Sequence, residues 1–436
     1  MGKTLQSLRR STFLAVAVAA ALYPITTAAA VAGKVFEYLR GDPADMGRAV
    51  FGSNTLTNLI PTIYNSLDVV SRELVGFIPA VSSDMTHERA AVGQTVRSPV
   101  APASTASDIT PAVTPPNDGD QTIGSVSMTI SKSRRVPIRW NGEEKLGLDN
   151  NGAPFNVIFR DQVSQAMRTL VNEVEADTAA LHISASRAYG TAGTTPFAST
   201  LGDPAQMRKI LVDNGAPTTD LQLVIDTSAG ANMRTLAQLT KANEAADTNL
   251  LRRGVLLDIH GFAIRESAQV KQAVTVGTAS GATTNNAGYA VGTTTFTLAS
   301  AGTGTLIAGD VITFAGDTNK YVVVSGDTDV SNGGTLTIAA PGIKVAMSAA
   351  TKAITVVAAA ARNMAFSRNA LCLATRVPAL PPQGDSAADR QIVTDPVSGL
   401  SFEIAMYPQY RQMQYEVSLA WGVAAPKPEH LAILLG

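Results

Sequence analysis

The longest helical pattern in the sequence runs from about Phe155 to Arg187. Apolar residues recur there at steps of three and four residues, at Val163, Met167, Leu170, Val171, Val174 and Leu181. At a rise of 1.5 Å per residue, a helix of about thirty residues is roughly 45 Å long. Such a helix is too long for a small bundle, so the pattern predicts a spine along which other elements pack.

The chain before this spine favours extended structure. Five prolines and many Ser and Thr residues lie between residues 92 and 124, a composition that disfavours helix. From Ser125 to Ser131, apolar and polar residues alternate, which predicts a half-buried strand. Two charged blocks follow, consisting of Arg134, Arg135 and Arg139 and then Glu143, Glu144 and Lys145. Together these features predict a long charged hairpin.

Helix and strand signals alternate after the spine. Asp203 and Pro204 predict the start of a helix with the carboxylate as its N-cap, and Gly215 predicts its end. The next signals are a strand at 221–225, a helix capped by Thr227 and Ser228, and a strand at 259–264. This order predicts a compact α/β unit.

Between about Val274 and Val357 the helical pattern disappears and Gly, Thr, Ala, Ser and Val dominate. Short strand signals separated by Gly-Asp and Asn-Gly turns occur at 295–298, 311–314, 321–324, 335–338 and 353–357. Strands of this length and spacing predict a small β-barrel or sandwich inserted into the α/β chain. Two further strand signals follow at 402–407 and 415–423.

Composition excludes several classes of protein. The 436 residues are 45% hydrophobic and 16% charged, which suits two or three folded domains and excludes a solvated tail protein. A net charge of −1 provides no global attraction to nucleic acid or to an anionic membrane. One cysteine, Cys372, excludes an intramolecular disulfide and any zinc site built from several thiolates.

Common catalytic motifs are absent from the sequence, so we predict no catalytic, cofactor-binding or metal-binding residues and no enzymatic activity. The four histidines are far apart, and Cys372 has no histidine near it in sequence to activate it. The run from Asp327 to Gly333 resembles a calcium loop, but its glycine is one position late and Ile338 stands where an acid is needed. A turn is the better interpretation.

The first thirty residues have the layout of a secretory signal peptide. Lys3, Arg9 and Arg10 precede an apolar run, and Ala28, Ala29 and Ala30 follow it. A start placed too far upstream, with Met46 as the later start, and a cleaved prepiece are the alternatives. The apolar run is short for a bilayer, so we expect no membrane partner.

Several segments, in this order, resemble the major capsid proteins of tailed double-stranded-DNA bacteriophages. They are the run Asn54–Pro61, Phe159-Arg160-Asp161-Gln162 in the spine, Phe366–Arg376 after the insertion, Gly399-Leu400-Ser401, and Trp421-Gly422-Val423. The branch that they resemble is that of short-tailed phages, whose coat proteins carry an inserted β-barrel domain. The resemblance covers residues 54–436 and does not extend to residues 1–53.

The resemblance implies an α+β fold with an N-terminal arm, an extended loop, a peripheral domain with the spine helix, a central α/β domain and an inserted small β-barrel. The corresponding ranges are 1–53 (signal-like extension or mis-set start), 54–92 (arm and helix), 93–150 (extended loop), 151–199 (peripheral domain), 200–272 with 358–436 (central domain) and 273–357 (insertion).

Function would then lie in self-association. The resemblance implies hexamers and pentamers that tile an icosahedral shell, assembled in the cytoplasm of a host bacterium, with a scaffolding protein, a portal ring and packaged double-stranded DNA as partners. The candidate intersubunit residues are Arg134, Arg135, Arg139, Glu143, Glu144, Lys145, Asp310, Asp317, Asp327 and Asp329. Complementary charges of this kind suit a head-to-tail contact.

Three alternatives remain open on the sequence alone. A nanocompartment shell of the same fold would enclose an enzyme instead of a genome. An exported β-rich surface or adhesion protein would account for the signal-like segment and the Thr-rich insertion. A secreted hydrolase is the enzyme alternative, and the missing motifs argue against it.

Overall fold

A computed structural model describes residues 75–100, 106–114, 119–150, 155–240, 258–272, 274–395 and 398–436. The chain divides into two compact units, residues 1–67 with 139–155 and residues 68–138 with 156–436. The signal-like segment, and the predicted N-terminal helix up to residue 74, lie outside the described residues. The sequence pattern predicts this helix over residues 54–81, and its described part, residues 75–81, forms turns instead of helix.

The first unit is described over residues 139–150 and Phe155. It contains the end of strand β4 (Lys132–Asn141) and helix α4 (Gly142–Asn150). Trp140 and Phe155 meet edge to face at a centroid distance of 5.4 Å. The acidic block was expected in a hairpin strand. It lies in the first turn of α4 instead, where acidic side chains are favoured by the helix dipole.

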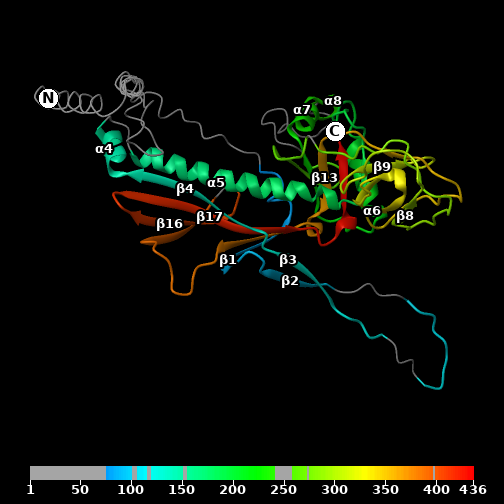
Figure 1. Ribbon diagram of the computed structural model, residues 1–436, viewed down its shortest axis with the longest axis horizontal. Helices are drawn as coiled ribbons and strands as arrows, with labels where there is room; N and C mark the ends of the chain where they lie inside the picture. The colour runs from blue at the N-terminus through cyan, green and yellow to red at the C-terminus, as the bar shows by residue number, and fades with distance from the viewer. Residues whose placement is uncertain are drawn as a thin grey trace, which may run out of the picture. The chain divides into compact units, whose positions relative to one another are not determined.

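A six-stranded sheet forms one layer of the second unit (Figure 1). Five strands follow the order β1 (Ser82–Ala90), β14 (Cys372–Pro378), β17 (Gln412–Ala424), β16 (Ser401–Gln409) and β15 (Asp389–Thr394), and β4 pairs with β17. The β1–β14 pair is parallel, and the β14–β17, β17–β16 and β16–β15 pairs are antiparallel. The strands predicted at 402–407 and 415–423 are therefore present, each slightly longer than predicted.

Helix α5 (Phe155–Ala180) runs along strands β4 and β17 (Figure 1). Its 26 residues span about 39 Å. Phe159 of the helix contacts Tyr415 of β17 at a ring-centroid distance of 4.4 Å. The predicted spine is thus present but ends at Ala180. It is followed by a 3-10 turn, η1 (Leu181–Ser184), and Arg187 already belongs to strand β5 (Arg187–Tyr189).

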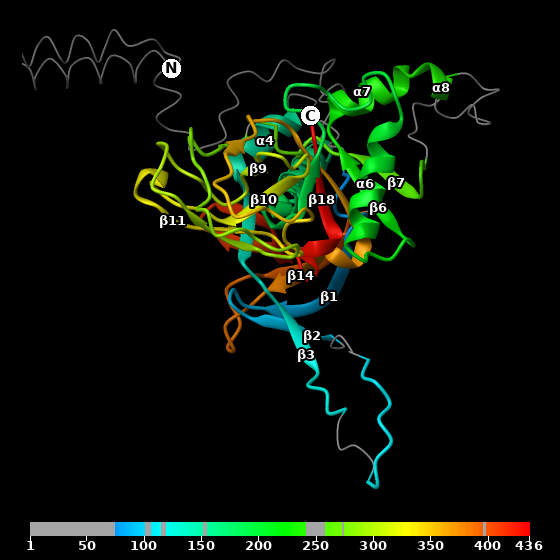
Figure 2. The same cartoon turned by 90° about the vertical axis from the view of Figure 1, so that its right-hand side faces the viewer.

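A separate two-stranded hairpin is formed by β2 (Thr95–Val100) and β3 (Gly124–Thr129), paired from Thr95↔Thr129 to Val100↔Gly124. The described part of the loop between them has no helix or strand (Figures 1 and 2). This arrangement corrects the predicted charged hairpin. Strand β3 pairs with β2, whereas the basic strand β4 pairs with the distant β17.

The second sheet has ten strands. Its main path is β12 (Ile354–Val356), β9 (Val311–Phe314), β10 (Lys320–Ser325), β5, β18 (Leu431–Leu435), β13 (Arg362–Ser367), β6 (Leu221–Ile225) and β7 (Phe262–Glu266). Helices α6 (Gly202–Asp213), α7 (Thr227–Thr235) and α8 (Ala237–Thr240) accompany it. The core between α6, α7 and the sheet includes Met207, Leu211, Leu223, Met233 and Phe262.

The two helix caps differ from the predicted ones. The Asp203 carboxylate accepts a hydrogen bond from the backbone N–H of Phe197 at 2.9 Å and does not cap α6. Asp226, one residue before the predicted Thr227 and Ser228, caps α7 by accepting bonds from two backbone N–H groups. In both cases the sequence contains several capping residue types in succession, so the pattern cannot say which of them does the capping.

The insertion closes into a ring of strands. Strand β11 (Gly334–Ile338) pairs with both β10 and β8 (Thr295–Leu298), and β9 pairs with both β10 and β12. Residues 282–285 complete the ring, since they hydrogen-bond to the β8 side through Ala299 and to the β12 side through Ile354. Phe296, Phe314 and Tyr321 are buried in its core. This is the expected small β-barrel, and it is continuous with the central sheet through β10 and β5.

Candidate interaction surfaces

The basic residues of β4 bind acidic residues of their own chain. Arg134 Nε lies 3.1 Å from Glu173 Oε2 of α5, and Arg135 Nη1 lies 2.8 Å from Glu416 Oε2 of β17. These arginines therefore join the helix, the strand and the sheet into one layer. Both arginines thus have intrachain partners, while their side chains remain 59% and 56% exposed.

Asp177 continues this connection. Its carboxylate accepts hydrogen bonds from Lys132 Nζ at 2.7 Å and from Trp421 Nε1 at 2.8 Å. Lys132 belongs to β4 and Trp421 to β17, so one helix residue bonds to two strands. The helical pattern of the sequence could not indicate these two partners, because both are distant in the chain.

Glu144 is the N3 residue of a capping box. Its Oε2 accepts the backbone N–H of Asn141 at 3.2 Å, and its own N–H donates to Asn141 Oδ1 at 2.7 Å. It is buried, so it does not offer an exposed intersubunit charge. Lys145 Nζ lies 4.8 Å from the ring centroid of Phe155. Arg139 and Glu143 remain candidates for an intersubunit contact.

Asp310 is buried, in contrast to its predicted place on a surface turn of the insertion. Its two carboxylate oxygens accept the backbone N–H groups of Gly277 and Ile307, both at 2.8 Å. The residue therefore fastens the start of the insertion to the turn before β9. A side chain in this position cannot reach another subunit.

The other three carboxylates of the insertion stabilise turns. Asp317 accepts the Tyr321 hydroxyl at 2.6 Å. Asp327 Oδ1 accepts the N–H of Asp329 at 2.8 Å, and Asp329 Oδ1 accepts the N–H of Ser331 at 3.1 Å. These hydrogen bonds support the interpretation of the run from Asp327 to Gly333 as a turn. Among the described residues, no group of three or more His, Cys, Asp or Glu could hold a metal ion.

Glu175 of α5 binds the backbone of residues 76–78. Its carboxylate accepts the backbone N–H groups of Gly76, Phe77 and Ile78 at 3.2, 3.0 and 2.7 Å, and the Ser267 hydroxyl at 2.8 Å. Burial raises the pKa of Glu175, and the hydrogen bonds to Ile78, Phe77, Ser267 and Gly76 act in the opposite direction. Gly76 is required here, because a Cβ would lie 2.7 Å from the Glu266 carbonyl oxygen.

A second buried cluster lies where the insertion joins the central sheet. His182 Nδ1 lies 3.1 Å from the Ala179 carbonyl oxygen, and burial lowers the pKa of His182 to about 4, with Arg362 and Lys271 adding to the shift. Arg362 is 1% exposed, and its three guanidinium nitrogens have no hydrogen-bond partner. Its backbone N–H donates to the Lys271 carbonyl at 2.9 Å, which brings together the two connections to the insertion.

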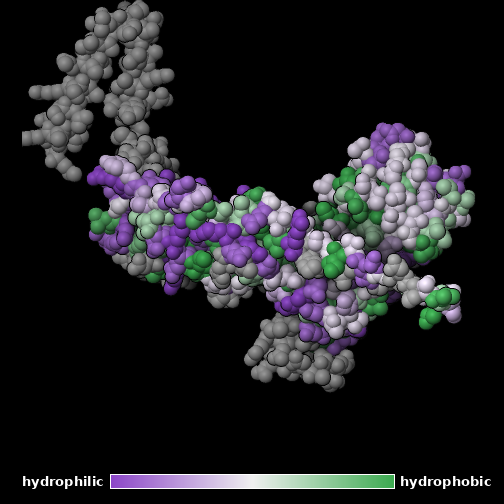
Figure 3. Space-filling model, turned by 90° about the horizontal axis from the view of Figure 1, so that it is seen from below, coloured by the Kyte–Doolittle hydropathy of each residue, from purple (hydrophilic) through white to green (hydrophobic). Residues whose placement is uncertain are grey.

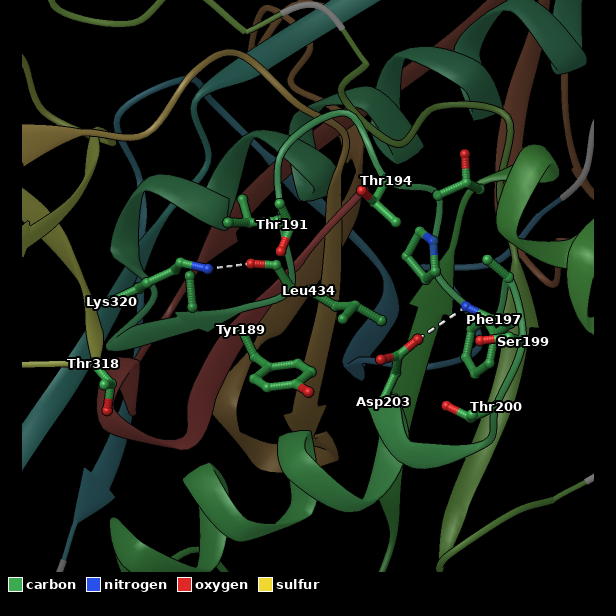
Figure 4. A pocket seen from close by; sticks show the side chains of 16 residues that line it. Tyr189, Thr191, Thr194, Phe197, Ser199, Thr200, Asp203, Thr318, Lys320 and Leu434 are labelled. Atoms are coloured by element: carbon green, nitrogen blue, oxygen red, sulfur yellow. Dashed lines mark hydrogen bonds between the residues drawn. The ribbon is translucent and has the colours of Figure 1, made fainter.

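A polar pocket of about 290 Å³ lies between the loop at 189–203, Lys320 and strand β18 (Figure 4). Lys320 Nζ donates to the Gly190 carbonyl oxygen, and Asp203 accepts from the Phe197 backbone. Burial lowers the pKa of Lys320. The remaining polar side chains are mainly threonines, which supply neither a nucleophile with a base nor a set of metal ligands. The pocket therefore offers no catalytic arrangement among its described lining residues.

A groove of about 520 Å³ lies at the base of the β2–β3 hairpin. Val96 of β2, Met128 of β3, Cys372 of β14 and Ala424 of β17 line it, with Arg97 and Lys427 as cations. Burial raises the pKa of the Cys372 thiol, as expected of an unreactive cysteine. Sequence reasoning missed this groove because its residues come from five separate segments of the chain.

Apolar residues on the face seen in Figure 3 are scattered among hydrophilic ones. The most exposed apolar side chains are Ile109 and Val113, at 97% and 104% exposure, and Tyr410, at 89%. Ile109 and Val113 belong to the loop between β2 and β3. No described helix is long and apolar enough to cross a membrane.

Searches with the sequence find no matching family model and no curated protein that is similar. Comparison with solved structures finds a chain of Mycobacterium phage Che8 at 11% identity, covering 87% of this chain and 98% of that one with a TM-score of 0.44. The capsid structure of cyanophage P-SCSP1u is similar at 11% identity, covering 91% of this chain and 98% of that chain with a TM-score of 0.44. The crystal structure of a virus-like particle from Pyrococcus furiosus is similar at 10% identity, covering 85% of this chain and 96% of that chain with a TM-score of 0.38.

Proposed function

We propose that this chain is a major capsid protein, a structural subunit that self-assembles into an icosahedral shell around packaged phage DNA. The observation that carries the proposal is the loop between β2 and β3, where Ile109 and Val113 are fully exposed on chain without regular structure. Burial of such apolar side chains under a second copy lowers the free energy of the assembly.

The helix-backed sheet supports the same function. Ion pairs and hydrogen bonds from Arg134, Arg135 and Asp177 hold β4, α5 and β17 together within one chain. Because these bonds hold the layer together within one chain, its edges can contact other copies without rearrangement of the layer. Head-to-tail contacts between such layers close into rings, as hexamers and pentamers require.

Further partners follow from this function as parts of the proposal. A scaffolding protein would guide assembly, a portal ring would occupy one vertex, and double-stranded DNA would be enclosed without sequence specificity. The net charge of −1 fits a shell that holds DNA by confinement instead of by charge attraction. The protein would assemble in the cytoplasm of the host bacterium and remain in the virion capsid, with no catalytic role.

Sedimentation velocity on the purified full-length chain tests the proposal. A 45.3 kDa subunit that forms shells will sediment largely as particles of many copies, alone or after co-expression with a scaffolding protein. A chain that stays monomeric in both conditions, with its folded secondary structure intact, would contradict the proposed function.

A further inference from the structure

Arg362 of β13 places a positive charge inside the subunit without a hydrogen-bond partner for it. The residue is 1% exposed, and its Nε, Nη1 and Nη2 atoms donate no hydrogen bond to any described residue. A guanidinium has five N–H donors, and buried donors in folded proteins are nearly always paired. The side chain therefore fits a ligand that accepts several hydrogen bonds at once.

The charge of Asp310 acts on Arg362, but its carboxylate does not supply these bonds. Burial lowers the pKa of the Arg362 guanidinium, and the charge of Asp310 acts in the opposite direction. The two carboxylate oxygens of Asp310 accept the backbone N–H groups of Gly277 and Ile307, both at 2.8 Å. Asp310 thus offsets part of the charge without a hydrogen bond, and the donors of Arg362 need another acceptor.

The groups around Arg362 carry an excess of one positive charge. His182 Nε2 is buried and has no hydrogen-bond partner among the described residues, whereas Nδ1 lies 3.1 Å from the Ala179 carbonyl oxygen. Burial lowers the pKa of His182 to about 4, with the charges of Arg362 and Lys271 adding to the shift, so the ring is neutral at pH 7. Arg362 and Lys271 then oppose the single negative charge of Asp310. One monovalent anion balances the difference, as a buried charge requires.

We propose that Arg362 binds a small monovalent inorganic anion, of the class of chloride, inside the subunit. The anion accepts hydrogen bonds from the guanidinium, and charge-assisted bonds of this kind are the strong ones. The Arg362 backbone N–H also donates to the Lys271 carbonyl oxygen at 2.9 Å, so the site lies where the chain enters and leaves the insertion. Binding of the anion therefore stabilises the root of the insertion, whether or not the subunit is assembled.

The chloride dependence of thermal stability tests the site on the purified full-length chain. Sodium chloride replaces sodium gluconate at constant ionic strength, because gluconate is too bulky for a buried guanidinium and the exchange keeps charge screening unchanged. A ligand that binds only the folded chain raises its melting temperature with concentration. We expect a rise of at least about 2 °C as chloride reaches about 200 mM, and a constant melting temperature overturns the proposal.

Arg362→Met removes the donors and keeps a long side chain in the core. Its melting temperature should not rise when chloride replaces gluconate. Arg368→Met is the matched control, because Arg368 lies just after β13 in η3 (Arg368–Ala370), is 38% exposed and is paired with Asp220 at 2.7 Å. This control should respond to chloride as the wild type does. A full chloride response of Arg362→Met would place the binding site elsewhere and overturn the proposal.

Bromide locates the anion without any substitution, because it binds as chloride does and scatters X-rays anomalously. Crystals of the wild-type chain grown in bromide should show an anomalous peak within hydrogen-bonding distance of the Arg362 guanidinium. Anomalous peaks only at other places on the protein, or a water molecule at Arg362 without anomalous signal, would contradict the proposed site.

Discussion

Glu175 shows how a single residue can hold a distant segment in place. Its buried carboxylate accepts three consecutive backbone N–H groups at Gly76–Ile78 and the Ser267 hydroxyl. Hydrogen bonds to a charged group contribute more than neutral ones, and a buried donor left unpaired is costly. The residue therefore anchors the segment at residues 76–78 to helix α5.

Replacing Glu175 with alanine should lower the free energy of unfolding by about 3 kcal/mol, because several buried donors lose their acceptor. Glu173→Ala is the matched control on the same helix. Its salt bridge with Arg134 is largely exposed to solvent, so its loss should destabilise the subunit much less than the loss of Glu175. Urea unfolding of the dissociated subunit measures both values, and equal effects would contradict the anchoring role.

His182 predicts a pH dependence of stability. The pKa of about 4 in the folded chain lies below the usual histidine pKa of 6.5, so folding favours the neutral ring. Above pH 6.5 the contribution of His182 to the free energy of unfolding is fully present. As the pH falls from 6.5 to about 4, the unfolded chain takes up a proton that the folded chain does not, and stability is lost.

We expect the substitution His182→Gln to remove this part of the pH dependence. The difference in unfolding free energy between wild type and variant should change by up to about 3 kcal/mol between pH 7 and pH 4, since one pKa unit corresponds to about 1.4 kcal/mol. Parallel stability curves for the two proteins across this window would rule out the role of His182.

At the scale of elements, strand β5 and its Arg187 connect the insertion to the central domain. Strand β10 of the insertion pairs with β5 through Lys320↔Ala188 and Tyr321↔Arg187. The buried Arg187 Nη2 donates to the Ile210 carbonyl of α6 at 3.2 Å, and Nη1 donates to Asn319 of the insertion at 3.5 Å. One side chain thus ties the barrel, the sheet and α6 together.

Two buried arginines should therefore respond differently to the same substitution. Arg187→Met should destabilise the subunit by about 3 kcal/mol, because buried acceptors lose their donor. Arg362→Met should change stability by less than about 1 kcal/mol or increase it, because it removes a buried charge that has no hydrogen bond. Thermal melting of both variants checks the contrast, and a large loss for Arg362→Met would contradict it.

Local sequence patterns predicted the positions of the strands better than they predicted which strands pair with each other. Strands β8, β9 and β6 match their predicted ranges because Gly-Asp and Asn-Gly turns, or buried apolar runs, mark their ends in the sequence. The predicted charged hairpin was wrong because a strand pattern does not identify the neighbouring strand, and β4 pairs with β17. The groove depends on the long-range pairing of β14 with β1 and β17, so no local sequence pattern could reveal it.

At the scale of the whole molecule, the insertion is part of the central sheet and not a detachable module. Removing residues 274–357 would delete β8–β12 and leave β5 as an open edge. Open edges promote pairing between chains. The deletion variant should therefore form aggregates instead of shells, as measured by light scattering and electron microscopy, whereas shells of normal appearance would show that the insertion is dispensable.

Negative-stain electron microscopy of the purified chain, with intact-mass analysis of the same sample, tests the central claim most directly. Self-association into a shell predicts closed particles or tubes built from this one protein, and the mass will define which N-terminal residues the assembled subunit retains. Only small particles of uniform size, with a processed N-terminus, would contradict a capsid function and favour an exported protein.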